Sequence, residues 1–278
     1  MGIIIKQSLR TSIASYFGFV VGAFNNVYLF PKFIGSEGIG LLNLINAAAL
    51  LFLPILNMGF GTSISKFYPK FRDQPYFNSF LVYALVLPLI SFLIFVIAWP
   101  FTEGVFEWIF KSKAQIVFQN ISWVLPLSGI LLFFGLFEAL ARANYEVAVP
   151  NMIRSVYWRV LMGLFIVLIA SGLISYDYLI PLLVLSWFVM LFALIIYTLR
   201  VYKLKFSFNL SFWRSREVKK FNSFSGYVLL LASGGILIQK IDQLMVGSFL
   251  GTDSAGVLTL SMYFATLIEI PRRSIMQI

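Results

Sequence analysis

The sequence predicts an all-α polytopic membrane protein, and three observations lead to that class. Of the 278 residues, 60% are apolar, against about 45 to 50% in soluble domains. Only 12% are charged, roughly half the usual share of about 25%. The charged residues also lie mostly between long apolar runs. A single soluble core cannot bury so much hydrocarbon, so much of it faces lipid.

Eight runs without Asp, Glu, Lys or Arg mark the expected spans. A spanning helix needs about 20 mostly apolar residues, because lipid offers backbone groups no hydrogen-bond partner. The runs are 11–31, 38–65, 74–102, 114–137, 160–176, 178–199, 221–239 and 254–268. We expect the seventh helix to continue through Lys240 and Asp242, and the eighth through Glu269. Each such charge costs about 2.5 to 3.5 kcal/mol at a helix centre, so each needs a reason.

The basic residues indicate the orientation of these spans. If the spans alternate, 16 of the 21 Lys and Arg residues lie on the side of the amino terminus and three on the opposite side. The positive-inside rule then predicts a cytoplasmic amino terminus. The net charge of +10 is explained by topology, and we expect no nucleic-acid partner. The first apolar run is too long for a signal peptide, so we expect a retained helix.

The composition also excludes several kinds of chemistry. The sequence contains no Cys and no His, so thiol nucleophiles, imidazole metal ligands and histidine proton relays are impossible. We predict no catalytic residue, no metal site and no cofactor.

An internal repeat appears when the sequence is shifted by 216 residues. FIGSEGIGLLNL at 33–44 aligns with FLGTDSAGVLTL at 249–260, with five identical positions. In both copies a Gly can end one helix, a Ser or Thr can cap the next, and an acid can lie at its positive end. Alternatively, the two segments are unrelated helical hairpins that have similar turn sequences.

The repeat predicts the domain organisation. Six spans separate the copies, so they have the same direction and are related by an axis along the membrane normal. We predict a first six-helix lobe at 1–201, a cytoplasmic basic amphipathic linker at 202–220, and the first two helices of a second lobe at 221–278. We expect the chain to be a fragment lacking at least four helices, unless a partner chain supplies them. Phe206, Phe208, Phe212 and Trp213 suit a linker in the headgroup region, although a solvated linker is an equal alternative.

These elements resemble the polysaccharide biosynthesis flippases of the multidrug, oligosaccharidyl-lipid and polysaccharide exporter superfamily. The resemblance is carried by the basic start of the first helix, FIGSEGIGLLNL, the amphipathic segment before the seventh helix, and IDQLMVGSFLGTDSAGVLTLSMYFATLIEIPRRSI. It implies two lobes around a central cavity and transport of polyprenyl-pyrophosphate-linked oligosaccharide across the bacterial cytoplasmic membrane, without enzymatic chemistry. It also implies membrane lipid and other polysaccharide-assembly proteins as partners.

Two other functions stay open. A multidrug antiporter coupled to H⁺ or Na⁺ would need buried carboxylates that face an organic cation. A membrane-embedded polysaccharide polymerase or glycosyltransferase would need an acid or base near the outer surface. The candidate cations inside the membrane favour an anionic substrate and therefore the flippase.

Arg159 is the first candidate for a phosphate contact, since phosphate needs cations inside a wet cavity. A fifth helix that starts at Pro150 would place Arg159 about 13 Å along its axis, at 1.5 Å per residue. The alternative is a side chain that reaches back to the inner interface.

The seventh helix carries a second polar group. Gln239, Asp242 and Gln243 share one face, and Lys240 lies about 100° away from Gln239. We expect this stripe to face the cavity, with Lys240 and Asp242 bonding to other helices or water rather than to each other. The alternative is a position near the outer interface.

The first helix offers matching polar groups. The 216-residue shift aligns Asn26 with Asp242, and Asn25 is adjacent. Both asparagines are candidates for the cavity, or alternatively hydrogen-bond neighbouring helices.

Three further arginines lie where helices enter the membrane. Arg10, Arg272 and Arg273 could guide an anionic headgroup inward, or they anchor the inner ends of the helices, with Glu269 paired to one of the last two.

Overall fold

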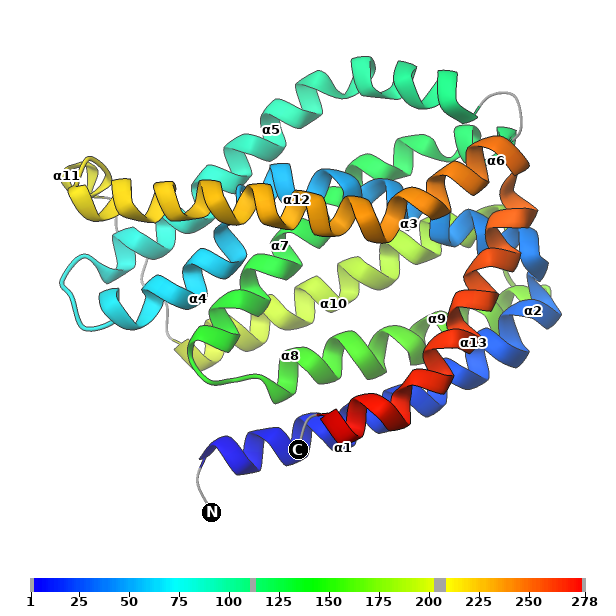
Figure 1. The fold of residues 1–278 in the computed structure, drawn as a ribbon, viewed down its shortest axis with the longest axis horizontal. Coiled ribbons are helices and arrows are strands. Elements are labelled where there is room, and N and C mark those ends of the chain that lie inside the picture. Colours follow the sequence, from blue (N-terminus) through cyan, green and yellow to red (C-terminus); the bar gives the residue numbers. More distant parts are fainter. Residues whose placement is uncertain (1–2, 111–113, 203–208, 277–278) are drawn as a thin grey trace.

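The computed structural model describes residues 3–110, 114–202 and 209–276, and every regular element in these ranges is a helix. Figure 1 shows them as a bundle of long rods that run back and forth. The long α-helices are α1 (Ile3–Phe24), α3 (Gly35–Asn57), α5 (Phe77–Phe110), α7 (Val124–Ala143), α9 (Trp158–Ala170), α10 (Leu179–Tyr202), α12 (Arg216–Leu250) and α13 (Thr252–Met276). The shorter α-helices are α2 (Phe30–Phe33), α4 (Phe60–Phe71), α6 (Gln115–Gln119), α8 (Ala148–Met152) and α11 (Leu210–Trp213). Two π-helical turns, η1 (Asn25–Leu29) and η3 (Ile153–Tyr157), and two 3₁₀ turns, η2 (Ile121–Trp123) and η4 (Tyr176–Tyr178), complete them.

The all-α membrane fold is confirmed. Seven helical stretches in the described part of the chain are long and apolar enough to cross a membrane. The eighth predicted span corresponds to α13, whose backbone is continuous but whose side chains are described only as far as Ala265. The protein is therefore a multi-pass membrane protein.

We expected the second apolar run to form one helix, but it forms two. α3 ends at Asn57, and Met58 and Gly59 have positive φ angles of 52° and 74°. Gly59 also lies so close to the backbone carbonyl of Ser225 in α12 that a side chain there would overlap it. The turn is therefore fixed both by its conformation and by a neighbouring helix, and α4 starts a new direction at Phe60.

The fifth span starts earlier than the charge-free run predicts. It covers Ala148–Ala170 through α8, η3 and α9, so Arg154 and Arg159 both lie inside it. Arg154 donates to the carboxylate of Glu138 on α7 at 3.4 Å. An ion pair of this kind offsets part of the cost of placing a charge in the span, and a search for uncharged runs misses it.

The segment before the seventh span packs against protein. Phe212 is buried against Phe71 and Tyr76, and the ring of Trp213 contacts Tyr83. The rings of these two residues therefore contact protein side chains, while the position of the segment in the headgroup region stays a prediction. Phe206 and Phe208 lie outside the described residues. α12 begins at Arg216, with Ser215 as its N-cap.

The two copies of the repeated turn cross each other. Gly40 of α3 approaches the backbone carbonyl of Thr252, and Gly256 of α13 approaches that of Ser36. Thr252 and Ser36 are themselves equivalent under the 216-residue shift, so the contact is reciprocal. α1 and α12, the helices that precede the two turns, run in the same direction (Figure 1), as parallel repeats require.

One detail of this turn differs from the prediction. The hydroxyl of Ser36 does not cap its own helix but donates to the carboxylate of Asp253 in the other copy. Glu37 and Asp253 do lie in the first turns of α3 and α13, where an acid is favourable. The predicted positive φ angles occur at Gly35 and Gly251.

Candidate functional site

The candidate site lies between the first and fifth spans, where η1 contacts α9 and η3 contacts α1. η1 interrupts the first span and η3 interrupts the fifth, and α1 packs along η3. Gly18 allows this approach, because a side chain there would overlap the backbone carbonyl of Ser155. π-helical turns are rare and occur frequently at functional sites. Here both turns lie directly next to Arg159.

The side chain of Arg159 contacts its own span and α1. Its Nη1 donates to the carbonyl oxygen of Ser155 at 2.6 Å. Its side chain passes over Gly22, where an added Cβ would lie only 2.5 Å from Nε. Asn25 fixes the backbone, since its Nδ2 donates to the carbonyl of Arg159 at 2.7 Å. The guanidinium therefore has a defined position between the first and fifth spans.

The depth of Arg159 decides how its charge can be stabilised. It is the twelfth of the 23 residues in the span Ala148–Ala170, so either end is about 16 Å away along the helix. An arginine side chain is too short to reach an interface over that distance. Among the described residues, no carboxylate forms an ion pair with it. Arg159 is thus a half-buried cation at the middle of its span without an acidic partner there.

Tyr263 of α13 completes the cluster from the second repeat. Its hydroxyl lies 3.2 Å from the position of a Cβ on Gly22, beside the Nε of Arg159. This hydroxyl is buried and lies beside the amide of Asn26. Arg159, Asn26 and Tyr263 together form what we call the central polar cluster.

The two asparagines of the first helix have different roles. Asn25 is only 4% exposed, and its amide is used to hold the backbone of α9. Asn26 is partly exposed, donates to the carbonyl of Gly22 at 2.8 Å, and faces Tyr263. Asn25 therefore positions the site, whereas Asn26 belongs to its surface.

The polar residues of α12 do not all face one way. Gln243 is buried and its Nε2 lies 3.7 Å from the sulfur of Met262, whereas Gln239 and Asp242 are exposed. Lys240 is half-buried and donates to the Oε1 of Gln243 at 3.3 Å. The predicted partner of Lys240 on another helix is therefore replaced by a neighbour on its own helix. These four residues form a second polar group separate from Arg159.

Three predicted site residues are placed only by their backbone. Arg10 lies on α1, and Arg272 and Arg273 lie on α13, but their side chains are outside the described residues.

Sequence reasoning missed Tyr263, Ser155 and the contact of the Arg159 side chain with Gly22. The spacing of Gly18 and Gly22 does predict close helix contact, and the contact at Gly18 confirms it. No pattern in the sequence marks Tyr263, because a single tyrosine in a membrane helix is unexceptional.

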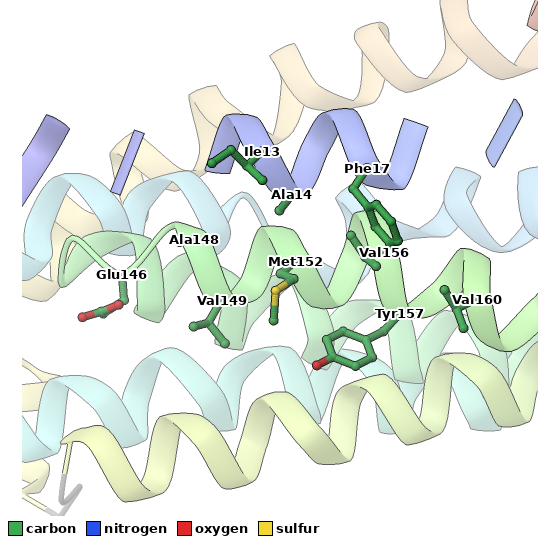
Figure 2. A pocket seen from close by; sticks show the side chains of 10 residues that line it. All are labelled: Ile13, Ala14, Phe17, Glu146, Ala148, Val149, Met152, Val156, Tyr157 and Val160. Carbon is green, nitrogen blue, oxygen red and sulfur yellow. The ribbon is translucent and has the colours of Figure 1, made fainter. Parts of the chain in front are cut away.

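An apolar cleft adjoins the central polar cluster. Figure 2 shows the side chains of α1, α8, η3 and α9 that line it. The volume of the cleft is about 630 Å³. Glu146 at one end is the one carboxylate among the ten lining residues, and none of the ten is Lys or Arg. Phe17 and Val160 line the cleft, and their chain neighbours Gly18 and Arg159 belong to the polar site. A polar and an apolar surface therefore lie next to each other along the same two helices.

The fold and the site define a class: a multi-pass α-helical membrane protein with an internal repeat and a cation at mid-span. The sequence model of the polysaccharide biosynthesis protein family matches residues 4–277. The chain belongs to this family. A search of curated proteins and a search of solved structures each found no match.

Proposed function

We propose that this protein is a flippase that carries polyprenyl-pyrophosphate-linked oligosaccharide across the bacterial cytoplasmic membrane. The observation that carries the proposal is Arg159, a cation at mid-span that lacks an acidic partner in the described structure. Burial of such a charge is costly unless a group of opposite sign binds it. A phosphate group that passes through the membrane supplies that charge and accepts hydrogen bonds from a guanidinium.

The neighbouring surfaces support an amphiphilic substrate. The central polar cluster offers donors to a phosphate, and the apolar cleft beside it offers hydrocarbon contacts to a lipid chain. A lipid-linked sugar has both parts, and its headgroup must cross the membrane while its tail stays in lipid. We propose that the protein performs this step by rearrangement of the two repeats, without covalent chemistry.

The proposed orientation places the amino terminus in the cytoplasm. The end of the bundle that carries Lys66, Lys70 and Arg72 also carries the start of α12, with Arg216 and Lys220. By the positive-inside rule this basic end faces the cytoplasm.

Multidrug antiport is less well supported. An organic cation would need a buried carboxylate, but Glu138 is bound to Arg154 and Asp242 is exposed. If Asp242→Asn abolished drug resistance while Arg159→Gln did not, antiport would replace the flippase proposal.

The test is Arg159→Gln in the full-length protein within a strain that depends on it for surface glycan. We expect surface glycan to fall at least tenfold while the amount of protein in the membrane stays unchanged. Arg159→Lys retains the charge and should restore part of the transport. The matched control is Arg154→Gln on the same span. This variant should lower the stability of the protein and leave transport per folded molecule nearly unchanged. Normal glycan export by Arg159→Gln at normal protein levels would overturn the proposal.

A further inference from the structure

A surface rich in basic side chains lies where α4 of the first repeat meets the start of α12 in the second. Figure 1 shows these two segments at the same end of the bundle, and they pack against each other. The stretches 66–73 and 214–220 contain seven cations and two acids, Asp73 and Glu217. All seven cations are exposed, and we call them the basic surface: Lys66, Lys70, Arg72, Arg214, Arg216, Lys219 and Lys220.

Contacts between the two repeats hold this surface together. Lys70 of α4 forms an ion pair with Glu217 of α12, and Lys220 lies 3.5 Å from the same carboxylate. The ammonium of Lys66 lies over the ring of Phe224 in α12, 3.5 Å from the ring centroid. The cations of the two segments therefore lie side by side.

The basic surface carries more positive charge than its own acids neutralise. Glu217 is shared by two lysines, and exposed ion pairs of this kind stabilise a protein only slightly. Like charges within a Debye length, about 8 to 10 Å, repel each other. An excess of five positive charges on two packed segments therefore raises the electrostatic potential and attracts anions.

The position of the surface along the helices limits the kind of anion that it meets. α12 contains 35 residues, which extend about 52 Å at 1.5 Å per residue, whereas the hydrocarbon core is about 30 Å thick. The charged start of α12, 216–220, is the part that extends beyond the hydrocarbon. α4 lies between the second span, which ends at Asn57, and the third, which starts at Phe77. The basic surface thus lies at the depth of lipid headgroups.

Aromatic rings beside the cations favour a lipid over a soluble anion. Phe67 and Phe224 are half-buried, and their ring centroids lie 5.9 Å apart. The ammonium of Lys66 lies beside both rings. A lipid phosphate bound by the lysines brings its glycerol and acyl chains next to these apolar rings, whereas an acidic peptide offers charge alone.

We propose that the basic surface binds the phosphate headgroup of an anionic phospholipid, such as phosphatidylglycerol, and that this lipid strengthens the contact between α4 and α12. Anionic headgroups attract clusters of Lys and Arg that lie next to a membrane span. Because the cations come from both repeats, a bound headgroup neutralises charge on both and reduces their repulsion. The inference is independent of the transported substrate, since Arg159 lies at the middle of its span.

Lipid titration of the full-length protein in detergent, followed by native mass spectrometry, tests the surface. The double variant Lys66→Gln with Lys219→Gln removes two cations that form no ion pair among the described residues. Phosphatidylglycerol should bind it about 25-fold more weakly than the parent protein, because each cation near an anionic lipid contributes about fivefold. Phosphatidylcholine should bind both proteins weakly. The matched control is Lys32→Gln on an exposed cation of α2, at the opposite end of the bundle (Figure 1), and it should bind phosphatidylglycerol like the parent.

Thermal unfolding tests the effect of the lipid on the contact between the repeats. Phosphatidylglycerol should raise the unfolding temperature of the parent protein, because a ligand that binds only the folded state stabilises it. The rise should be smaller in the double variant. Lipid that binds the parent without raising its unfolding temperature would overturn the stabilising role.

The remaining outcomes decide the identity of the partner. Equal affinity of the parent and the double variant for phosphatidylglycerol would overturn the proposal. Tight binding of poly-glutamate that the double variant loses, with equal affinity of the parent for the two lipids, would assign the surface to an acidic protein instead. Arg159→Gln should bind phosphatidylglycerol like the parent, so either result leaves the flippase proposal to its own test.

Discussion

The two copies of the repeated turn are alike, but the helices that lead into them differ. α1 gives way to the π-helical turn η1, which directs Asn25 and Asn26 toward α9 and α13. α12 continues without interruption to Leu250. Its residue Asp242, which the 216-residue shift aligns with Asn26, is exposed. The duplicated turn and its glycine crossing therefore support two helices with different tasks. The first builds the central polar cluster, and the second carries a polar group on the surface of the described bundle.

The largest expected effect comes from a substitution that separates the crossing helices α3 and α13. In Gly40→Ala the new methyl group overlaps the carbonyl of Thr252, and α3 and α13 must separate. We expect a loss of about 3 kcal/mol in unfolding free energy, typical of severe overpacking, and an equal loss for Gly256→Ala. Thermal unfolding in detergent measures it. Gly135→Ala, where nothing lies within 4 Å, is the control; equal stability of all three variants would contradict the reciprocal contact.

A smaller effect distinguishes the two leading helices. Asn25→Ala removes a buried hydrogen bond to Arg159 and should cost about 1 to 2 kcal/mol. Asp242→Ala removes an exposed side chain and should change stability by less than about 0.5 kcal/mol. Denaturation of both variants under one condition makes the comparison. An equal loss in the two would show that the leading helices are equivalent after all.

The hydrogen bond between the repeats gives a still smaller effect. Ser36→Ala removes the donor to Asp253 at the partly exposed end of the bundle. We expect a loss of about 1 kcal/mol, and Asp253→Asn should lose less because its amide oxygen still accepts. With both changes combined, the loss should exceed that of Ser36→Ala only by the favourable interaction of the Asp253 charge with the start of α13. Additive losses would mean that each residue acts through a different contact.

The smallest effect concerns the middle of α12. Gly234 and Gly235 have nothing within 4 Å of their missing side chains, so alanine meets no obstacle there. Gly234→Ala should raise stability by about 0.5 to 1 kcal/mol through helix propensity alone. A lower unfolding temperature would indicate that α12 needs a flexible point, which would set it further apart from α1.

The sequence predicted the positions of the long helices well, because lipid forces every backbone group into a helix. It predicted their ends less well where tertiary contacts decide. Arg154 and Arg159 made the fifth span look short, since the sequence does not show that Glu138 neutralises the first. Met58 gave no sign of the turn that ends α3, because a positive φ is uncommon for a residue other than glycine.

The candidate site was predicted in part for a similar reason. A charge inside an apolar run is visible in a sequence, so Arg159 was found. The π-helical turns follow from packing rather than from composition. η1 places Asn25 against the backbone of Arg159 and Asn26 beside Tyr263, whereas α12 has no such turn and its Asp242 is exposed. Tyr263 lies 104 positions further along the chain than Arg159, and only the crossing of α3 and α13 brings the two together.

The π-helical turns also make the site sensitive to a change in chain length. A π turn holds its wider hydrogen bonds over a few residues, and loss of one residue within 25–29 would return the helix to ordinary α geometry. The helix on either side of the turn would keep about the same facing, because the π turn accommodates the extra residue, and the side chains within the turn would change direction. A one-codon deletion would thus turn Asn26 away from Tyr263 without altering the composition of the helix, whereas the same deletion in an exposed loop would pass unnoticed.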